Sequence, residues 1–188
     1  QDDREVWTNG KRIKNVTTHP STMRCAETLA SFLDKQSEIK YKEKLTYLDD
    51  NGIRCAVSFK PPKSVNDVKF RGQAYYEWAK WSNGMFGRTP DYKNASIMSF
   101  AIAKSWLDTG IEKGLTHTCF SENIQNYYDF VRTNDKVLTH TLVNPQKSYQ
   151  VALEGKYDDE VALHVVKETD AGIIVKGARL LATLGPIA

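Results

Sequence analysis

Several features that would point to a particular class of protein are missing from this sequence. Its 188 residues include three cysteines, and Cys25, Cys55 and Cys119 stand far apart. Without a C-x-x-C pair or a cysteine cluster, no zinc or iron–sulfur site is expected. The odd, sparse count is typical of free thiols in a reducing cytosol. No stretch is apolar enough to cross a membrane or to act as a signal peptide. We therefore expect a cytoplasmic protein with no metal site and no membrane segment.

Charge of one sign and glycine-rich phosphate motifs are also scarce. The net charge is +3 with 26% charged residues, a balance too mild to indicate nucleic-acid binding. The segment GARLLATLGP matches neither G-x-G-x-x-G nor a P-loop, so any nucleotide cofactor would bind without a Rossmann turn. With 40% hydrophobic residues, the composition suits one large soluble domain, or one domain and part of another.

The first part of the chain has the pattern of short hairpins and helices. Asn-Gly pairs at 9–10 and 51–52 follow β-forming residues and predict tight turns. Apolar spacing over residues 22–36 predicts a helix. Ser64 and Asp67 form a capping-box pattern before a further helix.

Two more helices are expected before the helical pattern gives way to β-branched runs. The segment at about 90–108 is apolar nearly all round, which predicts a buried helix. A helix opening at Ser121 carries a stripe formed by Ile124, Tyr127, Tyr128 and Val131.

Beyond residue 136 the sequence consists of β-branched runs separated by turns, and residues 169–172 predict a hairpin turn. We therefore predict an α+β chain, with a helical domain at 1–136 and the opening strands of a β domain at 137–188. The final segment is apolar and lacks a polar tail, so we expect a piece of a longer protein.

The stretch GMFGRTPDY, residues 84–92, holds the first candidate for a polar pocket. Thr89 can cap a helix, Pro90 suits its first position, and Asp91 suits the positive end of its dipole. Arg88 and Tyr92 are four residues apart. They are either ordinary surface and packing residues or a pair of donors that faces a phenolate or carboxylate oxygen.

Histidine supplies the second candidate. His140 lies at the predicted domain junction, where ligand sites are common, and an imidazole there could exchange a proton near neutral pH. The alternative is a hydrogen-bonded structural residue, which is the interpretation we give to His19, His117 and His164. A nucleophile pair formed by Cys119 and His117 has only loop spacing in its favour.

Five stretches together resemble the oxygenase component of the two-component flavin monooxygenases of the 4-hydroxyphenylacetate 3-hydroxylase family. They occur in the family's order and are REVWTNGKRIKNVTTHP, GMFGRTPDY, ENIQNYYDFVRTND, LTHTLVNPQ and GIIVKGARLLATLGPIA. The resemblance implies an acyl-CoA dehydrogenase-like fold. The chain would hold the N-terminal helical domain and the truncated start of the middle β domain, without the C-terminal helical bundle.

The resemblance also implies roles for individual residues. The catalytic and substrate-binding groups around the phenolic oxygen would be Arg88, Tyr92 and His140. The residues along the flavin would be His140, Asn144, Pro145, Gln146 and Thr183. The sequence departs from the family at Lys147-Ser148-Tyr149, where many members carry an arginine, which puts flavin affinity or orientation in question. The segment 106–120 is longer than usual for the family, and this extra length could form an altered lid or an oligomer contact.

The implied activity is hydroxylation of a phenol ortho to its hydroxyl, from 4-hydroxyphenylacetate to 3,4-dihydroxyphenylacetate, in aromatic catabolism. It would use molecular oxygen and reduced FAD from a separate flavin reductase, in a homodimer or homotetramer. We expect the fragment alone to be inactive.

Three alternatives stay open from the sequence. The same chemistry could act on a chlorophenol, a nitrophenol or a tyrosine-derived metabolite. A lyase like 4-hydroxybutyryl-CoA dehydratase would need clustered cysteine ligands, which the sequence does not offer. The fragment could also be a stable helical domain without activity of its own.

Overall fold

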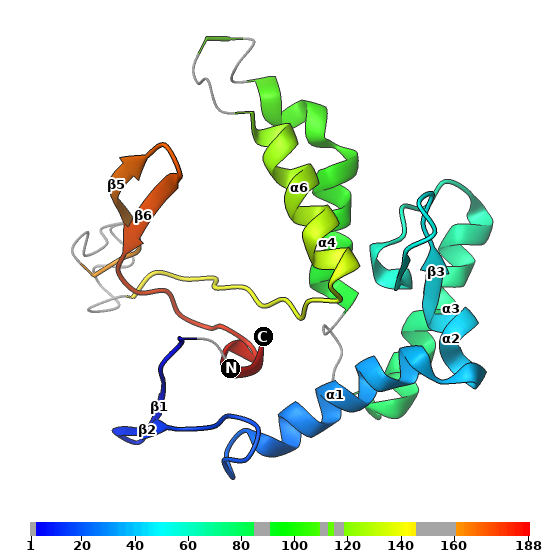
Figure 1. The fold of residues 1–188 in the computed structure, drawn as a ribbon, viewed down its shortest axis with the longest axis horizontal. Helices are drawn as coiled ribbons and strands as arrows, with labels where there is room; N and C mark the ends of the chain where they lie inside the picture. Colours follow the sequence, from blue (N-terminus) through cyan, green and yellow to red (C-terminus); the bar gives the residue numbers. More distant parts are fainter. Residues whose placement is uncertain (1–2, 85–90, 110–112, 115–118, 146–160) are drawn as a thin grey trace. The chain divides into compact units, whose positions relative to one another are not determined.

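The computed structural model describes residues 3–84, 91–109, 113–114, 119–145 and 161–188 (Figure 1). The chain separates into two compact units. The first comprises Gln1–Leu138 with Pro186–Ala188, and the second comprises Thr139–Gly185. The assignment of 1–136 and 137–188 to domains of a longer protein stays a prediction.

The first unit is built from two short hairpins and a series of helices. Its elements in chain order are β1 (Val6–Thr8), β2 (Lys11–Ile13), α1 (Met23–Ser37), α2 (Ile39–Leu45), β3 (Thr46–Leu48), β4 (Arg54–Ala56), the 3-10 helix η1 (Val57–Phe59), α3 (Val65–Trp81), α4 (Asp91–Ile102), the 3-10 helix η2 (Lys104–Asp108) and α6 (Phe120–Thr133). A last 3-10 helix, η3 (Gly185–Ile187), begins at the end of the second unit.

Local sequence signals account for several of these boundaries. Asn9 and Gly10 both have positive φ, 48° and 72°, as a tight hairpin turn between β1 and β2 requires, so the predicted turn is confirmed. The capping box before α3 is also confirmed: the Asp67 amide donates to Ser64 Oγ at 3.2 Å. Lys60 and Ser64 hydrogen-bond the Asp67 carboxylate and lower its pKa to about 2.

The buried segment η1 connects three helices of the first unit. The Ser58 carbonyl accepts from Arg71 Nη1 on α3 at 3.1 Å, and Ser58 Oγ accepts from Asn94 Nδ2 on α4 at 2.9 Å. The Phe59 carbonyl accepts from the Tyr128 hydroxyl on α6 at 2.7 Å. A one-turn segment cannot satisfy its own backbone groups, so side chains from the surrounding helices supply the missing partners.

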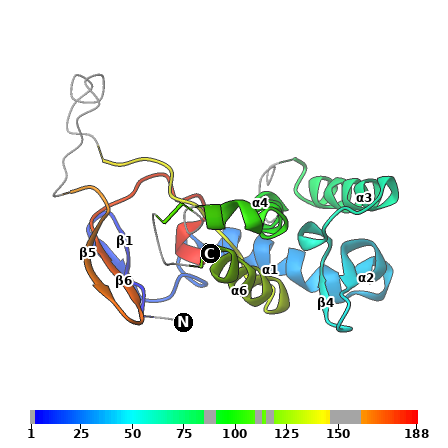
Figure 2. The ribbon, with the colours of Figure 1, turned by 90° about the horizontal axis from the view of Figure 1, so that it is seen from above.

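Two apolar clusters flank this segment. One is formed by Ala56, Phe59, Met98, Ala101, Tyr128 and Val131. The other is formed by Phe32, Leu45, Val57, Ala74 and Trp78. Figures 1 and 2 show α4 beside α6, whose contact is part of the first cluster. Because Val57 and Phe59 enter different clusters, η1 joins the two cores.

The prediction of one buried helix at 90–108 is wrong for the described residues. The helix α4 ends at Ile102, and η2 follows it. Met98 and Ala101 are buried, whereas Phe100 is 53% and Trp106 80% exposed. The sequence supplies apolar residues on several faces, but the described chain packs only one of them.

The predicted helix near Ser121 is confirmed as α6, which begins at Phe120. Tyr128 and Val131 of its stripe are buried, while Tyr127 is 45% exposed.

A pocket of about 620 Å³ lies within the first unit, between the β1–β2 hairpin and α1. Val137, Pro186 and Ile187 complete its lining. The end of the described sequence thus packs with the beginning, and Arg4 Nη1 donates to the Ala188 carbonyl.

The second unit contains an antiparallel hairpin of β5 (His164–Thr169) and β6 (Gly172–Lys176). Thr169 pairs with Gly172, which confirms the predicted turn at 169–172. At Gly177 a side chain is excluded, because φ is +118° and a Cβ would lie 2.3 Å from the Ala162 carbonyl oxygen.

Replacing Tyr128 with Phe removes the donor to the buried Phe59 carbonyl, together with the hydrogen bond between Tyr128 and Tyr47, and keeps the ring. We expect the free energy of unfolding, measured by urea denaturation, to fall by about 1–3 kcal/mol, because a buried acceptor loses its partner. The matched control is Tyr127→Phe on the exposed side of α6, where a change within about 0.5 kcal/mol is expected. Equal effects of the two changes would contradict the role given to this bond.

Candidate functional site

Tyr92 is the second residue of α4 and is 46% exposed. The Lys93 ammonium lies 4.5 Å from the centre of the Tyr92 ring. The backbone carbonyl of Tyr92 accepts a hydrogen bond from Ser96 Oγ at 2.9 Å. Arg88 lies outside the described residues, so the Arg88–Tyr92 pair stays a prediction.

The second candidate group lies in the second unit, on two stretches that are far apart in the sequence. The Leu142 amide donates to the Leu180 carbonyl at 3.0 Å, and the Leu180 amide donates to the Val143 carbonyl at 2.9 Å. Thr139 Oγ1 donates to the Thr183 carbonyl. Residues 139–144 and 180–183 therefore run side by side within this unit.

This pairing brings the predicted flavin residues close along the backbone. His140, Asn144 and Pro145 are partly buried and Thr183 is exposed, and all four belong to the paired stretches or adjoin them. Gln146 lies outside the described residues, as do Lys147, Ser148 and Tyr149. Tyr92 belongs to the first unit.

The chemistry of these side chains fits a flavin. An isoalloxazine ring presents carbonyl oxygens and ring nitrogens along one edge, which form hydrogen bonds with donors and acceptors of the protein. An imidazole, a carboxamide and a hydroxyl are available from His140, Asn144 and Thr183. These three residues could therefore hold the ring's polar edge.

The remaining histidines that the structure describes have local roles, as predicted. His19 Nδ1 accepts from the Ser21 amide at 3.2 Å, and His164 Nδ1 lies 2.7 Å from the Ala162 carbonyl oxygen. His117 lies outside the described residues. The three cysteines are free thiols, and within the described ranges no group of three acidic, His or Cys residues could hold a metal ion.

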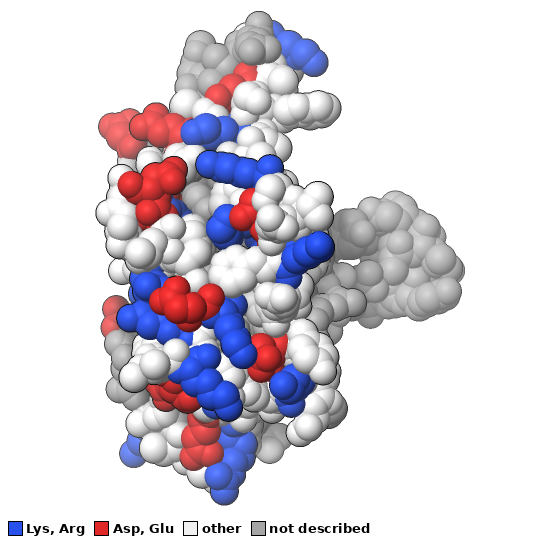
Figure 3. Space-filling view, turned by 90° about the vertical axis from the view of Figure 1, so that its right-hand side faces the viewer, with Lys and Arg blue, Asp and Glu red and all other residues white. Residues whose placement is uncertain are grey.

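Two further findings concern membranes and nucleic acids. None of the helices in the described part of the chain is both long and apolar enough to span a bilayer. On the face seen in Figure 3, cationic and anionic side chains are interspersed. That face lacks the single-sign patch that is typical of nucleic-acid binding.

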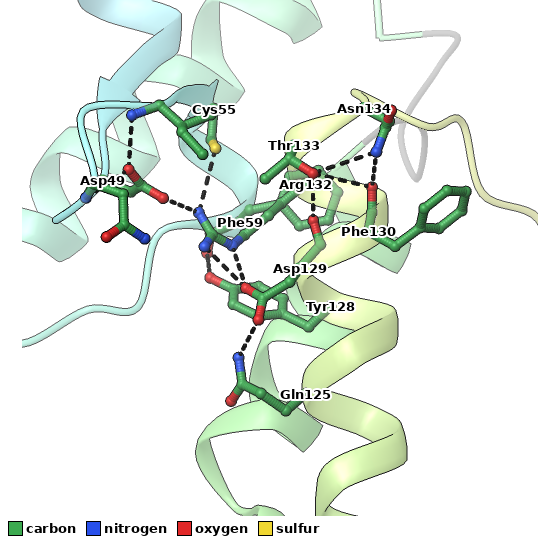
Figure 4. Close-up of polar contacts among 12 residues, drawn as sticks. Asp49, Cys55, Phe59, Gln125, Tyr128, Asp129, Phe130, Arg132, Thr133 and Asn134 are labelled. Atoms are coloured by element: carbon green, nitrogen blue, oxygen red, sulfur yellow. Dashed lines mark hydrogen bonds and ion pairs between the residues drawn. The ribbon is translucent and has the colours of Figure 1, made fainter.

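Figure 4 shows a polar cluster centred on Arg132, which the sequence analysis missed. Arg132 Nη1 donates to Asp49 Oδ2 at 2.6 Å, and Nε donates to Asp129 Oδ1 at 2.9 Å. The side chains of Arg132 and Asp49 are 11% and 8% exposed. The pair joins α6 to the turn after β3. Only the i,i+3 spacing of Asp129 and Arg132 was visible in the sequence.

Electrostatics indicate a structural role for this cluster. The hydrogen bond from Arg132 holds the pKa of Asp49 below its usual value, and burial raises the pKa of the Cys55 thiol. A protonated, buried thiol is a poor nucleophile. Burial, with the neighbouring Tyr128, also raises the pKa of Tyr47. Because the charges are paired with one another, the cluster connects elements and offers no reactive group.

Comparison with known proteins identifies the class. Solved structures with the same architecture include an oxygen-tolerant archaeal 4-hydroxybutyryl-CoA dehydratase from N. maritimus, 13% identical with a TM-score of 0.72 over 94% of this chain and 34% of that one. At that identity the likeness concerns the fold alone. The predicted class, an α+β chain of acyl-CoA dehydrogenase-like fold, is confirmed.

The family follows from the sequence. A sequence model described as 4-hydroxyphenylacetate 3-hydroxylase N terminal matches residues 1–188, and the chain belongs to this family. The 4-hydroxyphenylacetate 3-monooxygenase oxygenase component of Thermus thermophilus is 39% identical over 178 residues, which are 95% of this chain and 35% of that protein. The chain therefore spans about a third of the length of this relative.

A solved structure of such an oxygenase component, complexed with FAD and 4-hydroxyphenylacetate, is 39% identical. It superposes with a TM-score of 0.80 over 94% of this chain and 35% of that one.

The Arg132–Asp49 pair predicts a pH dependence of stability. The pKa of Asp49 is lower in the folded chain, so its contribution is complete above the unfolded value of about 3.9 and is lost as the pH falls through the folded value. In urea denaturation, Asp49→Asn should be less stable than wild type at pH 7, and the difference should shrink as the pH falls below about 3.9.

The matched control is Asp50→Asn at the exposed neighbouring position, which should change stability little. A difference between wild type and Asp49→Asn that stays constant with pH would contradict the assignment.

Proposed function

We propose that the longer protein to which this chain belongs is a reduced-FAD-dependent monooxygenase that hydroxylates 4-hydroxyphenylacetate to 3,4-dihydroxyphenylacetate. The match of the whole chain to the family, with relatives that carry this activity in their names, supports the proposal most directly. The chain covers about a third of that relative, so the activity is assigned to the complete protein and the fragment alone is expected to be inactive.

Reduced FAD, when bound, supplies the electrons that activate molecular oxygen for transfer of one oxygen atom to the ring. The residues of this chain act on the phenol. Arg88 and Tyr92 donate hydrogen bonds to the phenolic oxygen and stabilise the negative charge that develops there. His140 accepts the phenolic proton or holds it by a hydrogen bond. A ring with phenolate character is electron-rich at the carbon ortho to the oxygen, which favours attack at that position.

The flavin-binding part of the proposal assigns one polar edge of the ring to the second unit. The residues concerned are His140, Asn144, Pro145, Gln146 and Thr183. The backbone pairing of 139–144 with 180–183 supports this assignment, because it gives two distant stretches a common edge.

The proposal also includes partners and location. A separate flavin reductase delivers reduced FAD by diffusion, and the complete protein is a cytoplasmic homodimer or homotetramer. Domain 1–136 carries Arg88 and Tyr92, and domain 137–188 carries His140. Neither nucleic acid nor a membrane is a partner.

The experiment that tests the proposal uses the complete protein. It is mixed anaerobically with reduced FAD and 4-hydroxyphenylacetate, oxygen is admitted, and the catechol product is measured by chromatography. We expect catechol from the wild type and its loss in His140→Ala. Oxygen consumption without catechol from any phenol tested would reject the proposed reaction.

Arg88→Ala in the complete protein is expected to lower turnover about 10²–10³-fold, because one charge-stabilising donor is lost. The matched control is Arg24→Ala, which removes an arginine whose side chain is 82% exposed on α1. Its turnover should be unchanged. Near-normal turnover in Arg88→Ala would remove this residue from the site.

A further inference from the structure

The first described turn of α4 contains a buried amide. Asn94 is 3% exposed and lies on the face of α4 that also carries Met98 and Ala101. Its Nδ2 donates to Ser58 Oγ at 2.9 Å. Its Oδ1 is buried and has no hydrogen-bond partner among the described residues. A polar side chain therefore occupies a core position of an otherwise apolar face.

The partner of Asn94 is held firmly. Ser58 is 4% exposed, and its carbonyl accepts from Arg71 Nη1. The next residue, Phe59, is fully buried and bonded to Tyr128. Because η1 is fixed from α3 and α6, a bond to Ser58 anchors the start of α4 to the rigid centre of the first unit.

Tyr92 lies two residues before this anchor. With a rise of about 1.5 Å per residue, the two Cα atoms are separated by about 3 Å along the helix axis. Tyr92 is 46% exposed, and the backbone of this turn sets the point from which its side chain extends. Met98, the next buried residue on the face, lies one turn further along, so Asn94 is the first fully buried residue after Tyr92 in α4.

The bond to Ser58 uses the Asn94 nitrogen, and among the described residues its oxygen Oδ1 has no donor. A polar residue at a buried helix position departs from the apolar pattern of a core face. Departures of this kind from local rules concentrate where geometry serves function.

We propose that Asn94 is a positioning residue for the phenol site: its bond to Ser58 fixes the first turn of α4 and so places the Tyr92 hydroxyl. This inference rests on the proposed contact between Tyr92 and the phenol. The reacting groups must be held closely, since a displacement of about 1 Å can lower the rate about 10²-fold.

The test compares Asn94→Leu, which is similar in size and apolar, with Ser58→Ala in the complete protein. Each variant removes the hydrogen bond between Asn94 and Ser58: the first removes its donor and the second its acceptor. We expect faster amide hydrogen exchange in residues 91–95 and unchanged exchange in α6. For 4-hydroxyphenylacetate, kcat/KM should fall about 10- to 100-fold, mainly through kcat, while the affinity for reduced FAD is retained.

Met98→Leu is the matched control, because it alters the same face of α4 without a polar contact. It should leave exchange at 91–95 and the kinetics unchanged. Unchanged exchange at 91–95 in both test variants would overturn the inference. The inference would also be overturned if the two test variants showed faster exchange at 91–95 with unchanged kcat/KM while the kinetics of Tyr92→Phe were impaired.

Tyr92→Phe separates the two proposals. If Tyr92→Phe has normal kinetics, the proposed contact of Tyr92 with the phenol fails, and the positioning role of Asn94 fails with it. Faster exchange at 91–95 would then define Asn94 as a structural anchor only. If Tyr92→Phe is impaired, the kinetics of Asn94→Leu and Ser58→Ala decide the inference alone.

Discussion

The first unit depends on the burial of one short segment whose backbone must be satisfied from outside. In η1, the carbonyls of Ser58 and Phe59 have no regular secondary structure long enough to pair with. Arg71 and Tyr128 supply the donors, and apolar residues on either side of Ser58 enter separate cores. The packing of α3 and α6 and the hydrogen bonding of the η1 backbone are therefore one constraint. Moving either helix would leave a buried carbonyl without its donor.

Elements set by neighbours in the sequence could be predicted, and contacts between distant residues could not. The turn at 9–10, the capping box at Ser64 and the hairpin turn at 169–172 follow from local chemistry. The Arg132–Asp49 pair joins residues 83 positions apart, and no periodicity reveals it. The expectation for 90–108 failed because an apolar pattern says which faces of a helix can be buried, while burial itself depends on the chain that packs there.

The candidate site shows the same division. Arg88, Tyr92 and His140 were visible as residue types with suitable chemistry, but only the resemblance to a family gave them roles. The backbone pairing that places 139–144 beside 180–183 was not readable from the sequence. Neither was the anchor at Asn94, since an asparagine within an apolar helix is uninformative until its partner on η1 is known.

The order of the two units along the chain has a consequence for biosynthesis. The chain leaves the first unit at Leu138 and returns to it at Pro186, and Val137 and Pro186 line one pocket. The second unit is thus inserted between two segments of the first unit that line the same pocket. A ribosome adds about 5–20 residues per second, so the helices can pack seconds before the residues that close their pocket are made. During that interval the apolar floor of the pocket, which includes Leu29 and Leu33, is open to chaperones and to other nascent chains.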